Sequence, residues 1–224
     1  MKIMAFSDSH GRVSLPVIND DIDVVCVCGD IIPLPIQRNV EISILWLQGT
    51  FFRWIKESNV KKVFWVGGNH DFALESLGYN EINRLITDYG IDDRLVYLMD
   101  SSYEFEGKKF FGTPWVKDLR NWAFYSKDLN ETFKCIEDCD VLLTHIPPQI
   151  DKVGCSNPYQ FGEREFGAMA LTKVFEDKKI GINFCGHIHT GVHNGVKYND
   201  TTVYNVSLLD EDYNEAYKPT IIEI

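Results

Sequence analysis

Five short stretches of the sequence carry five of the six histidines together with carboxylate, amide or glycine residues. Neutral imidazoles, carboxylates and an amide oxygen suit Mn²⁺, Fe or Zn²⁺, and no thiolate lies in any of the stretches. Residues of these types could therefore hold divalent metal ions. The five stretches are Asp8-Ser9-His10-Gly11, Gly29-Asp30, Gly67-Gly68-Asn69-His70-Asp71, His145 and Gly186-His187-Ile188-His189.

Each residue taken alone has a simpler explanation, because Asp8 could cap a helix and Asp30 is a common turn residue. On extended segments, however, Asp8 and His10 would point the same way, as would His187 and His189. The candidate donors exceed what one ion needs. They fit two ions that share a bridging ligand and clamp the attacking and leaving oxygens of a phosphoryl displacement. The seven candidate donors are Asp8, His10, Asp30, Asn69, His145, His187 and His189.

Each stretch follows a short apolar run that is rich in β-branched and aromatic residues. Such near-continuous hydrophobicity predicts strands that are covered on both faces. Ligands of open α/β sheets bind beyond the carboxyl ends of the strands, so the donors would converge if these strands are neighbours. The five runs span residues 2–7, 23–28, 61–67, 140–144 and 182–185.

Helical periodicity separates these strands, over residues 44–55 and again over 129–136. The alternation predicts βαβ units and an α/β fold. After Gly186 the apolar runs become shorter, which predicts antiparallel strands that finish a second sheet; these runs span residues 192–198, 201–206 and 220–224. We expect one domain over residues 1–224, because the sequence has no internal repeat or linker.

The five stretches together resemble the calcineurin-like metallophosphoesterases in order and spacing, from residue 8 to residue 189. This resemblance implies an α/β fold that is a four-layer α/β/β/α sandwich of two mixed β-sheets. It also implies two divalent ions, for which we expect Mn²⁺, with Fe or Zn as alternatives. The ligands that it implies are Asp8, His10 and His189 for one ion, Asn69, His145 and His187 for the other, and Asp30 as the bridge.

The same resemblance implies that His70 is not a ligand but contacts the phosphate or protonates the leaving oxygen, with Asp71 orienting it. An imidazole changes protonation near neutral pH, and an adjacent carboxylate would fix its tautomer. Asp71 equally fits the N-cap of a helix that begins at Phe72, and the two roles are compatible. The expected reaction is in-line attack on phosphorus by a hydroxide that bridges the two ions.

The residues that follow or lie between these five stretches narrow the class of substrate. Protein Ser/Thr phosphatases and dinucleoside tetraphosphate hydrolases carry Gly-Asp-x-x-Asp-Arg-Gly, whereas Gly29-Asp30 runs into Ile31-Ile32-Pro33, so both are disfavoured. Further blocks look like the metallophosphoesterase-domain-containing phosphodiesterases, which implies hydrolysis of small phosphodiesters such as cyclic nucleotides. A nuclease, a phosphomonoesterase and a non-catalytic scaffold remain as alternatives. The further blocks are Gly112-Thr113-Pro114-Trp115, Leu143-Thr144-His145-Ile146-Pro147-Pro148 and Tyr204-Asn205-Val206-Ser207.

Three further features lie outside these stretches: a run of aromatic residues, one histidine and four basic residues. The aromatic stretch from Trp115 to Tyr125 is either a wall on which a nucleobase stacks or a small core beneath a loop. His193 is expected to be a turn residue. Four basic residues are either phosphate contacts or solvated surface charges: Arg12, Lys117, Arg120 and Arg164.

Charge and composition exclude several classes of protein. With 22 Lys and Arg against 33 Asp and Glu, the net charge of −11 disfavours nucleic acid as a partner. The residues before Asp8 are too few for a secretory leader, and no uncharged stretch is apolar enough to span a bilayer. The six cysteines have no CxxC spacing, so we expect reduced thiols in a cytoplasmic protein without a membrane partner.

Overall fold

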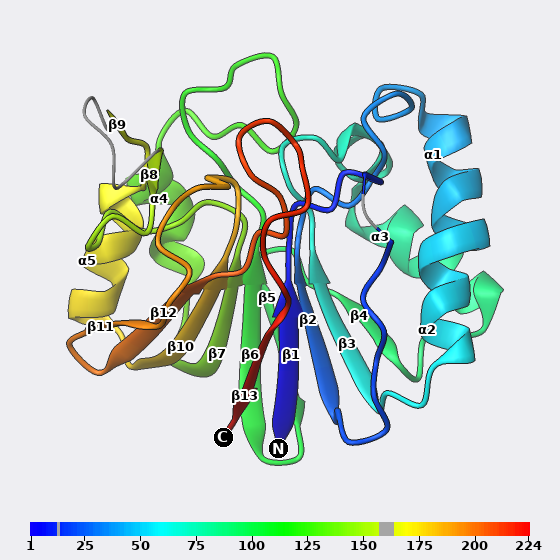
Figure 1. Ribbon diagram of the computed structural model, residues 1–224, viewed down its shortest axis with the longest axis horizontal. Coiled ribbons are helices and arrows are strands. Elements are labelled where there is room, and N and C mark those ends of the chain that lie inside the picture. Colours follow the sequence, from blue (N-terminus) through cyan, green and yellow to red (C-terminus); the bar gives the residue numbers. More distant parts are fainter. Residues whose placement is uncertain (13, 157–163) are drawn as a thin grey trace.

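The computed structural model describes residues 1–12, 14–156 and 164–224, and two mixed β-sheets form its centre (Figure 1). In the first sheet neighbouring strands are parallel, except that the C-terminal strand of the chain pairs antiparallel with the N-terminal strand. The order of this sheet is β13 (Thr220–Glu223), β1 (Lys2–Phe6), β2 (Val24–Cys28), β3 (Lys62–Val66) and β4 (Leu95–Tyr97).

The second sheet has four parallel inner strands and an antiparallel strand at each edge. Its order is β11 (Val196–Tyr198), β12 (Thr201–Asn205), β10 (Ile180–Cys185), β7 (Cys139–Thr144), β6 (Lys108–Thr113) and β5 (Ser101–Phe105). A separate short hairpin pairs β8 (Cys155–Ser156) with β9 (Arg164–Glu165).

Helices cover the outer face of each sheet (Figure 1). The first sheet is covered by α1 (Val40–Trp46), a π-helical segment η1 (Leu47–Phe52), α2 (Arg53–Glu57) and α3 (Phe72–Tyr89). The second is covered by α4 (Leu129–Thr132), the 3₁₀ turn η2 (Phe133–Cys135) and α5 (Met169–Asp177). Of the helices in the described part of the chain, none combines the length and the apolar character that crossing a bilayer requires.

Three apolar clusters separate the four layers. Trp65 belongs to the cluster between the first sheet and its helices, and Phe175 to the one between the second sheet and α5. Between the two sheets, the rings of Phe64 and Phe110 stack with their centroids 4.1 Å apart. The predicted α/β/β/α sandwich of two mixed sheets is therefore confirmed.

The five predicted strands are confirmed as β1, β2, β3, β7 and β10. The expectation that all later strands finish the second sheet antiparallel is wrong on two points. The strand β12 pairs parallel with β10, and β13 returns to the first sheet, where Glu223 pairs with Lys2. The edge of β1 that does not face β2 is available for this pairing, and hydrophobic alternation alone does not say which sheet a strand joins.

Candidate metal centre

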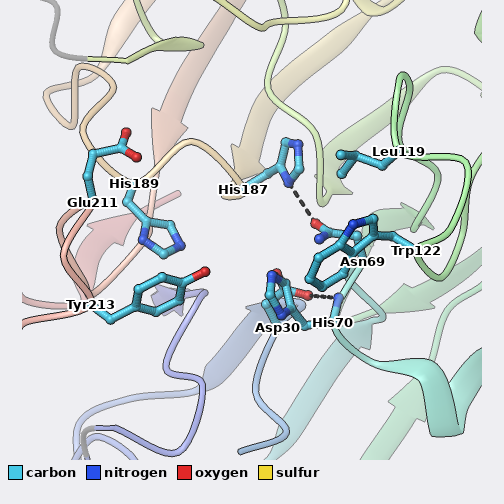
Figure 2. A pocket seen from close by; sticks show the side chains of 9 residues that line it. All are labelled: Asp30, Asn69, His70, Leu119, Trp122, His187, His189, Glu211 and Tyr213. Carbon is cyan, nitrogen blue, oxygen red and sulfur yellow. Dashed lines mark hydrogen bonds and ion pairs between the residues drawn. The ribbon is translucent and has the colours of Figure 1, made fainter. Parts of the chain in front are cut away.

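The predicted donors converge on a cavity of about 250 Å³ beyond the carboxyl ends of the strands, which point toward the top of Figure 1. Asp8, His10 and His145 lie beneath its floor and are at most 1% exposed. Figure 2 shows the side chains around the opening. The residues that line the cavity are Asp30, Asn69, His70, Leu119, Trp122, His187, His189, Glu211 and Tyr213.

One set of donors comes from the loops after β1 and β10. The Nε2 atoms of His10 and His189 are 3.4 Å apart, and Oδ1 of Asp8 lies 3.9 Å from the first and 3.5 Å from the second. The other oxygen of Asp8 accepts a hydrogen bond from the Ser207 hydroxyl, at 2.7 Å. The carboxylate is thereby fixed with Oδ1 facing the two imidazoles.

The second set of donors comes from the loops after β3, β7 and β10. The Asn69 side-chain oxygen lies 2.9 Å from Nε2 of His145 and 2.7 Å from Nδ1 of His187 (Figure 2 shows the second contact). Imidazole rings from two strands of the second sheet thus meet an amide that the first sheet supplies. The structure brings together all the donors that the sequence predicts for the second ion.

Asp30, after β2, lies between the two sets. Its Oδ2 atom is 3.3 Å from Nε2 of His145 and 3.8 Å from Nε2 of His10. Its Oδ1 atom accepts a hydrogen bond from the backbone N–H of His70, at 2.7 Å. One carboxylate therefore faces both donor sets, which is the placement that a bridging ligand requires.

The orientation of the rings fits divalent cations. Nδ1 of His145 donates to the Cys28 carbonyl oxygen at 2.8 Å, and Nδ1 of His189 donates to that of Asp210 at 2.9 Å. We assign the ring protons to Nδ1 from these contacts, which leaves both Nε2 lone pairs directed at the other donors. Nε2 of His145 then faces the Asn69 oxygen, acceptor against acceptor, and a cation satisfies such a pair.

With no cation bound, protons on the imidazole rings supply part of the positive charge between these acceptor atoms. Burial lowers the pKa of His145 and His189, but the carboxylates beside them, Asp30 and Asp8 respectively, outweigh burial and raise both values to about 9. Burial lowers the pKa of His10 to about 4, so this ring stays neutral. Because protons and metal ions compete for the same imidazole lone pairs, metal binding at neutral pH releases protons.

Left-handed backbone conformations direct the donors into the cavity. Asp8, His10, Asp30 and His187 have φ of 54°, 48°, 55° and 69°. This conformation costs a non-glycine residue roughly 1–2 kcal/mol, and such strain is concentrated at functional sites. The expected extended backbone at Asp8-x-His10 is therefore wrong: tight turns after the strands make these donors converge, not the alternation of a strand.

Two glycines leave room for the carboxylates. A Cβ atom at Gly68 would collide with Oδ1 of Asp30 and come within 2.7 Å of the His145 ring. A Cβ atom at Gly186 would collide with Oδ2 of Asp8. The glycines in these two blocks are required by close approach of side chains from neighbouring loops.

His70 lies at the rim of the cavity, with Nε2 4.0 Å from Oδ2 of Asp30 and its ring against Trp122, centroids 4.4 Å apart. Its Nδ1 atom is 2.7 Å from the Gln37 side-chain oxygen. We expected Asp71 to orient this ring, but within the described residues the side chain that contacts Nδ1 is Gln37. No sequence signal marks Gln37, which lies in a loop seven residues after Asp30.

Asp71 occupies the N-cap position of α3, as the alternative interpretation expects, but its side chain does not cap the helix. It turns back and accepts hydrogen bonds from the backbone N–H groups of Asp30 at 2.7 Å, Gly68 at 2.9 Å and Ile32 at 3.2 Å. Burial and the nearby Asp30 carboxylate raise the pKa of Asp71 to about 7. Asp71 therefore joins the loops after β2 and β3.

Two tryptophans of the aromatic stretch, Trp115 and Trp122, have different surroundings. Trp115 is a packing residue, because its Nε1 donates to Oδ2 of Asp100 at 2.7 Å and its ring lies edge-on to Phe124. Trp122 instead lines the cavity, with Leu119 from the same loop.

The remaining features lie outside the cavity lining. The four basic residues considered as phosphate contacts, Arg12, Lys117, Arg120 and Arg164, are not among the lining residues of the described chain. His193, expected in a turn, lies in the loop between β10 and β11, and its Nε2 is 2.7 Å from the His189 carbonyl oxygen.

Comparisons with known proteins show similarity in sequence and in fold. The family model of the calcineurin-like phosphoesterases matches residues 1–191. Metallophosphoesterase domain-containing protein 1 of Homo sapiens is 23% identical over 259 residues, which cover 100% of this chain and 71% of that protein. A UPF0046 protein of Caenorhabditis elegans is 27% identical over 262 residues, covering 100% and 81%. In fold, phosphopantetheinyl hydrolase from Mycobacterium tuberculosis matches with a TM-score of 0.59 at 16% identity, covering 95% of this chain and 90% of that one.

Proposed function

Because this chain belongs to the calcineurin-like phosphoesterase family, we propose that it is a metal-dependent phosphodiesterase that hydrolyses small phosphodiesters such as cyclic nucleotides. Membership of the family indicates a hydrolase of phosphoric esters that depends on two metal ions. The observation that carries the proposal is the pair of converging donor sets that share Asp30 at the floor of a cavity.

The proposed ligands divide as the two donor sets do. Two divalent ions, when bound, would neutralise phosphoryl oxygens and lower the pKa of a water molecule to near neutrality. We propose Mn²⁺, with Fe or Zn as alternatives, since all the donors are nitrogen or oxygen atoms. Asp8, His10 and His189 would hold one ion and Asn69, His145 and His187 the other, with Asp30 shared.

Charge and size support a small substrate rather than a nucleic acid strand. The cavity has a volume of about 250 Å³, and among its described lining residues none is Lys or Arg. The Glu211 carboxylate lies at its rim, on a chain with a net charge of −11. A long polyanion would be repelled by this surface, whereas one phosphate group can reach the donors. The six free cysteines support a reducing compartment, and we propose the cytoplasm.

Removal of metal tests the proposal directly. We expect the purified protein to bind two divalent ions per chain and to hydrolyse bis-p-nitrophenyl phosphate. Exhaustive chelation should abolish turnover, and Mn²⁺, Fe²⁺ or Zn²⁺ added back one at a time should restore it and rank the metals. Metal analysis and absorbance of nitrophenolate measure both. Full turnover after chelation would contradict metal dependence, and two bound ions without hydrolysis would favour the non-catalytic scaffold.

A substrate panel separates the alternatives within the family. The panel contains 2′,3′- and 3′,5′-cyclic nucleotides, phosphomonoesters and single-stranded DNA. We expect the cyclic diesters to give the highest kcat/KM. A higher value for monoesters would identify a phosphomonoesterase, and a higher value for DNA a nuclease.

His70 is proposed to protonate the leaving oxygen, because its Nε2 faces the cavity while Gln37 holds its Nδ1. We expect His70→Ala to reduce kcat on a diester with an alkoxide leaving group by about 10²–10⁴-fold, the usual contribution of general acid catalysis. The loss on a nitrophenyl ester should be much smaller, since nitrophenolate leaves without a proton. Gln37→Met should give the same pattern with a smaller loss. Equal losses on both substrates would remove the general-acid role from His70.

A further inference from the structure

One aromatic residue of the cavity, Tyr213, belongs to none of the five stretches that carry the candidate donors. It lies in the loop between β12 and β13, and its ring is edge-on to the rings of His10 and His189, with centroids 5.0 Å and 5.2 Å away. Figure 2 shows its hydroxyl pointing into the cavity, from the side opposite Trp122. The phenol therefore enters the cavity above the first set of donors.

The loop holds Tyr213 in a strained conformation, with φ of 60°. The Asp210 carboxylate accepts N–H bonds from Asp212 at 3.0 Å and Asn214 at 2.9 Å, which closes a tight turn around Tyr213. The Asp210 carbonyl oxygen accepts from the backbone N–H of Tyr213 at 3.0 Å and from Nδ1 of His189 at 2.9 Å. One carbonyl group thus positions both Tyr213 and a proposed metal ligand.

Packing against the imidazoles explains the ring of Tyr213 but not its hydroxyl. A phenylalanine would make the same edge-on contacts with His10 and His189. Within the described residues the Tyr213 hydroxyl has no hydrogen-bond partner. A hydroxyl that points into a cavity whose described lining carries no Lys or Arg is a donor available to a ligand.

We propose that the Tyr213 hydroxyl is a substrate-binding group that donates a hydrogen bond to a non-bridging phosphate oxygen. This inference rests on the proposed function, because it takes the ligand of the cavity to be a phosphate group. A phosphate oxygen is a charged acceptor, and a neutral phenol donates to it without adding charge to the site. Tyr213 would then orient the phosphate from one side while His70 faces the leaving oxygen from the other.

The test is Tyr213→Phe, which removes the hydroxyl and keeps the ring. We expect the affinity of the metal-loaded protein for inorganic phosphate, measured by calorimetry, to fall about 10- to 100-fold, the usual worth of a hydrogen bond to a charged group. kcat/KM for bis-p-nitrophenyl phosphate should fall by a similar factor. Metal content and the midpoint of thermal unfolding should not change. Tyr217→Phe is the matched control, because Tyr217 lies in the same loop, outside the cavity lining, with its ring stacked on His193.

Some results of these measurements would overturn the role of Tyr213, and others would overturn the proposed function alone. If Tyr213→Phe binds phosphate as tightly as the wild type while Tyr213→Ala loses metal, the ring alone matters and the proposal is wrong. Failure of the wild-type protein to bind phosphate at all also overturns it. If the wild type binds phosphate but hydrolyses no ester, the proposed function fails, and the assignment of Tyr213 still stands or falls on the phosphate affinity of the phenylalanine variant.

Discussion

Replacing Asp30 by alanine should reduce kcat/KM for a phosphodiester by about a thousand-fold or more. The Asp30 carboxylate faces both donor sets, with Oδ2 3.3 Å from His145 and 3.8 Å from His10. Its removal weakens both proposed metal sites at once. Ions of this kind contribute several kcal/mol of charge stabilisation in the transition state, and about 1.4 kcal/mol corresponds to a factor of ten in rate.

Two measurements accompany the rate for Asp30→Ala. Metal analysis should give fewer than two ions per chain, and circular dichroism should show an unchanged fold, because Asp30 follows β2 and its side chain lies in the cavity floor rather than in an apolar cluster. Asp140→Asn is a suitable control, since Asp140 lies at the opposite end of β7 from His145. Retention of both ions and more than a tenth of the activity in Asp30→Ala would rule out the bridging role.

Asp71→Asn should lower both the free energy of unfolding and the hydrolytic activity, although asparagine has the same shape as aspartate. Oδ2 of Asp71 accepts from Asp30 and Gly68, and Oδ1 accepts from Ile32. An asparagine can keep only one oxygen in place, so its NH₂ group would face an N–H donor. A buried donor without an acceptor costs about 1–3 kcal/mol of unfolding free energy. Displacement of Asp30 should lower metal affinity or activity by about 10–100-fold, as loss of partners behind metal ligands usually does.

Urea denaturation, metal titration and hydrolysis assays would measure these effects of Asp71→Asn. Asp128→Asn is the matched control, because Asp128 also accepts backbone N–H bonds, at the N-cap of α4, but is exposed and far along the chain from the donor loops. Asparagine caps helices about as well as aspartate, so that variant should be close to wild type. If Asp71→Asn were equally neutral, Asp71 would not join the two loops in the way that its hydrogen bonds indicate.

The central strands and the candidate donors are predictable from local patterns, whereas the four-layer arrangement follows from the resemblance to the calcineurin-like metallophosphoesterases. Strands covered on both faces are continuous apolar runs, and the donors follow those runs directly, as Asp30 follows β2 and His145 follows β7. The partner sheet of β13 was not predictable. Its four residues alternate in burial as any edge strand does, and long-range pairing with Lys2 leaves no trace in that alternation.

The supporting contacts of the site could not be predicted for a different reason. Gln37 and Tyr213 lie in loops that fold back on distant segments, where Gln37 contacts His70 and Tyr213 lines the cavity. Asp71 shows the same limit: its position before α3 suggested a cap, and its adjacency to His70 suggested an orienting role. Only the three-dimensional arrangement shows that its acceptors serve the N–H groups of two loops instead.

The division of the donors between the two sheets has a consequence for how the protein matures. Asp8, Asp30 and Asn69 follow strands of the first sheet, whereas His145 and His187 follow strands of the second. During synthesis β1, β2 and β3 emerge first, with Asp8 and Asp30 among the donors that follow them, whereas His145 and His187 come later in the chain, and β13 completes the first sheet last. If these residues are the ligands, neither donor set is complete before residue 189 is synthesised and the two sheets dock, so we expect uptake of the ions to be a late step of folding.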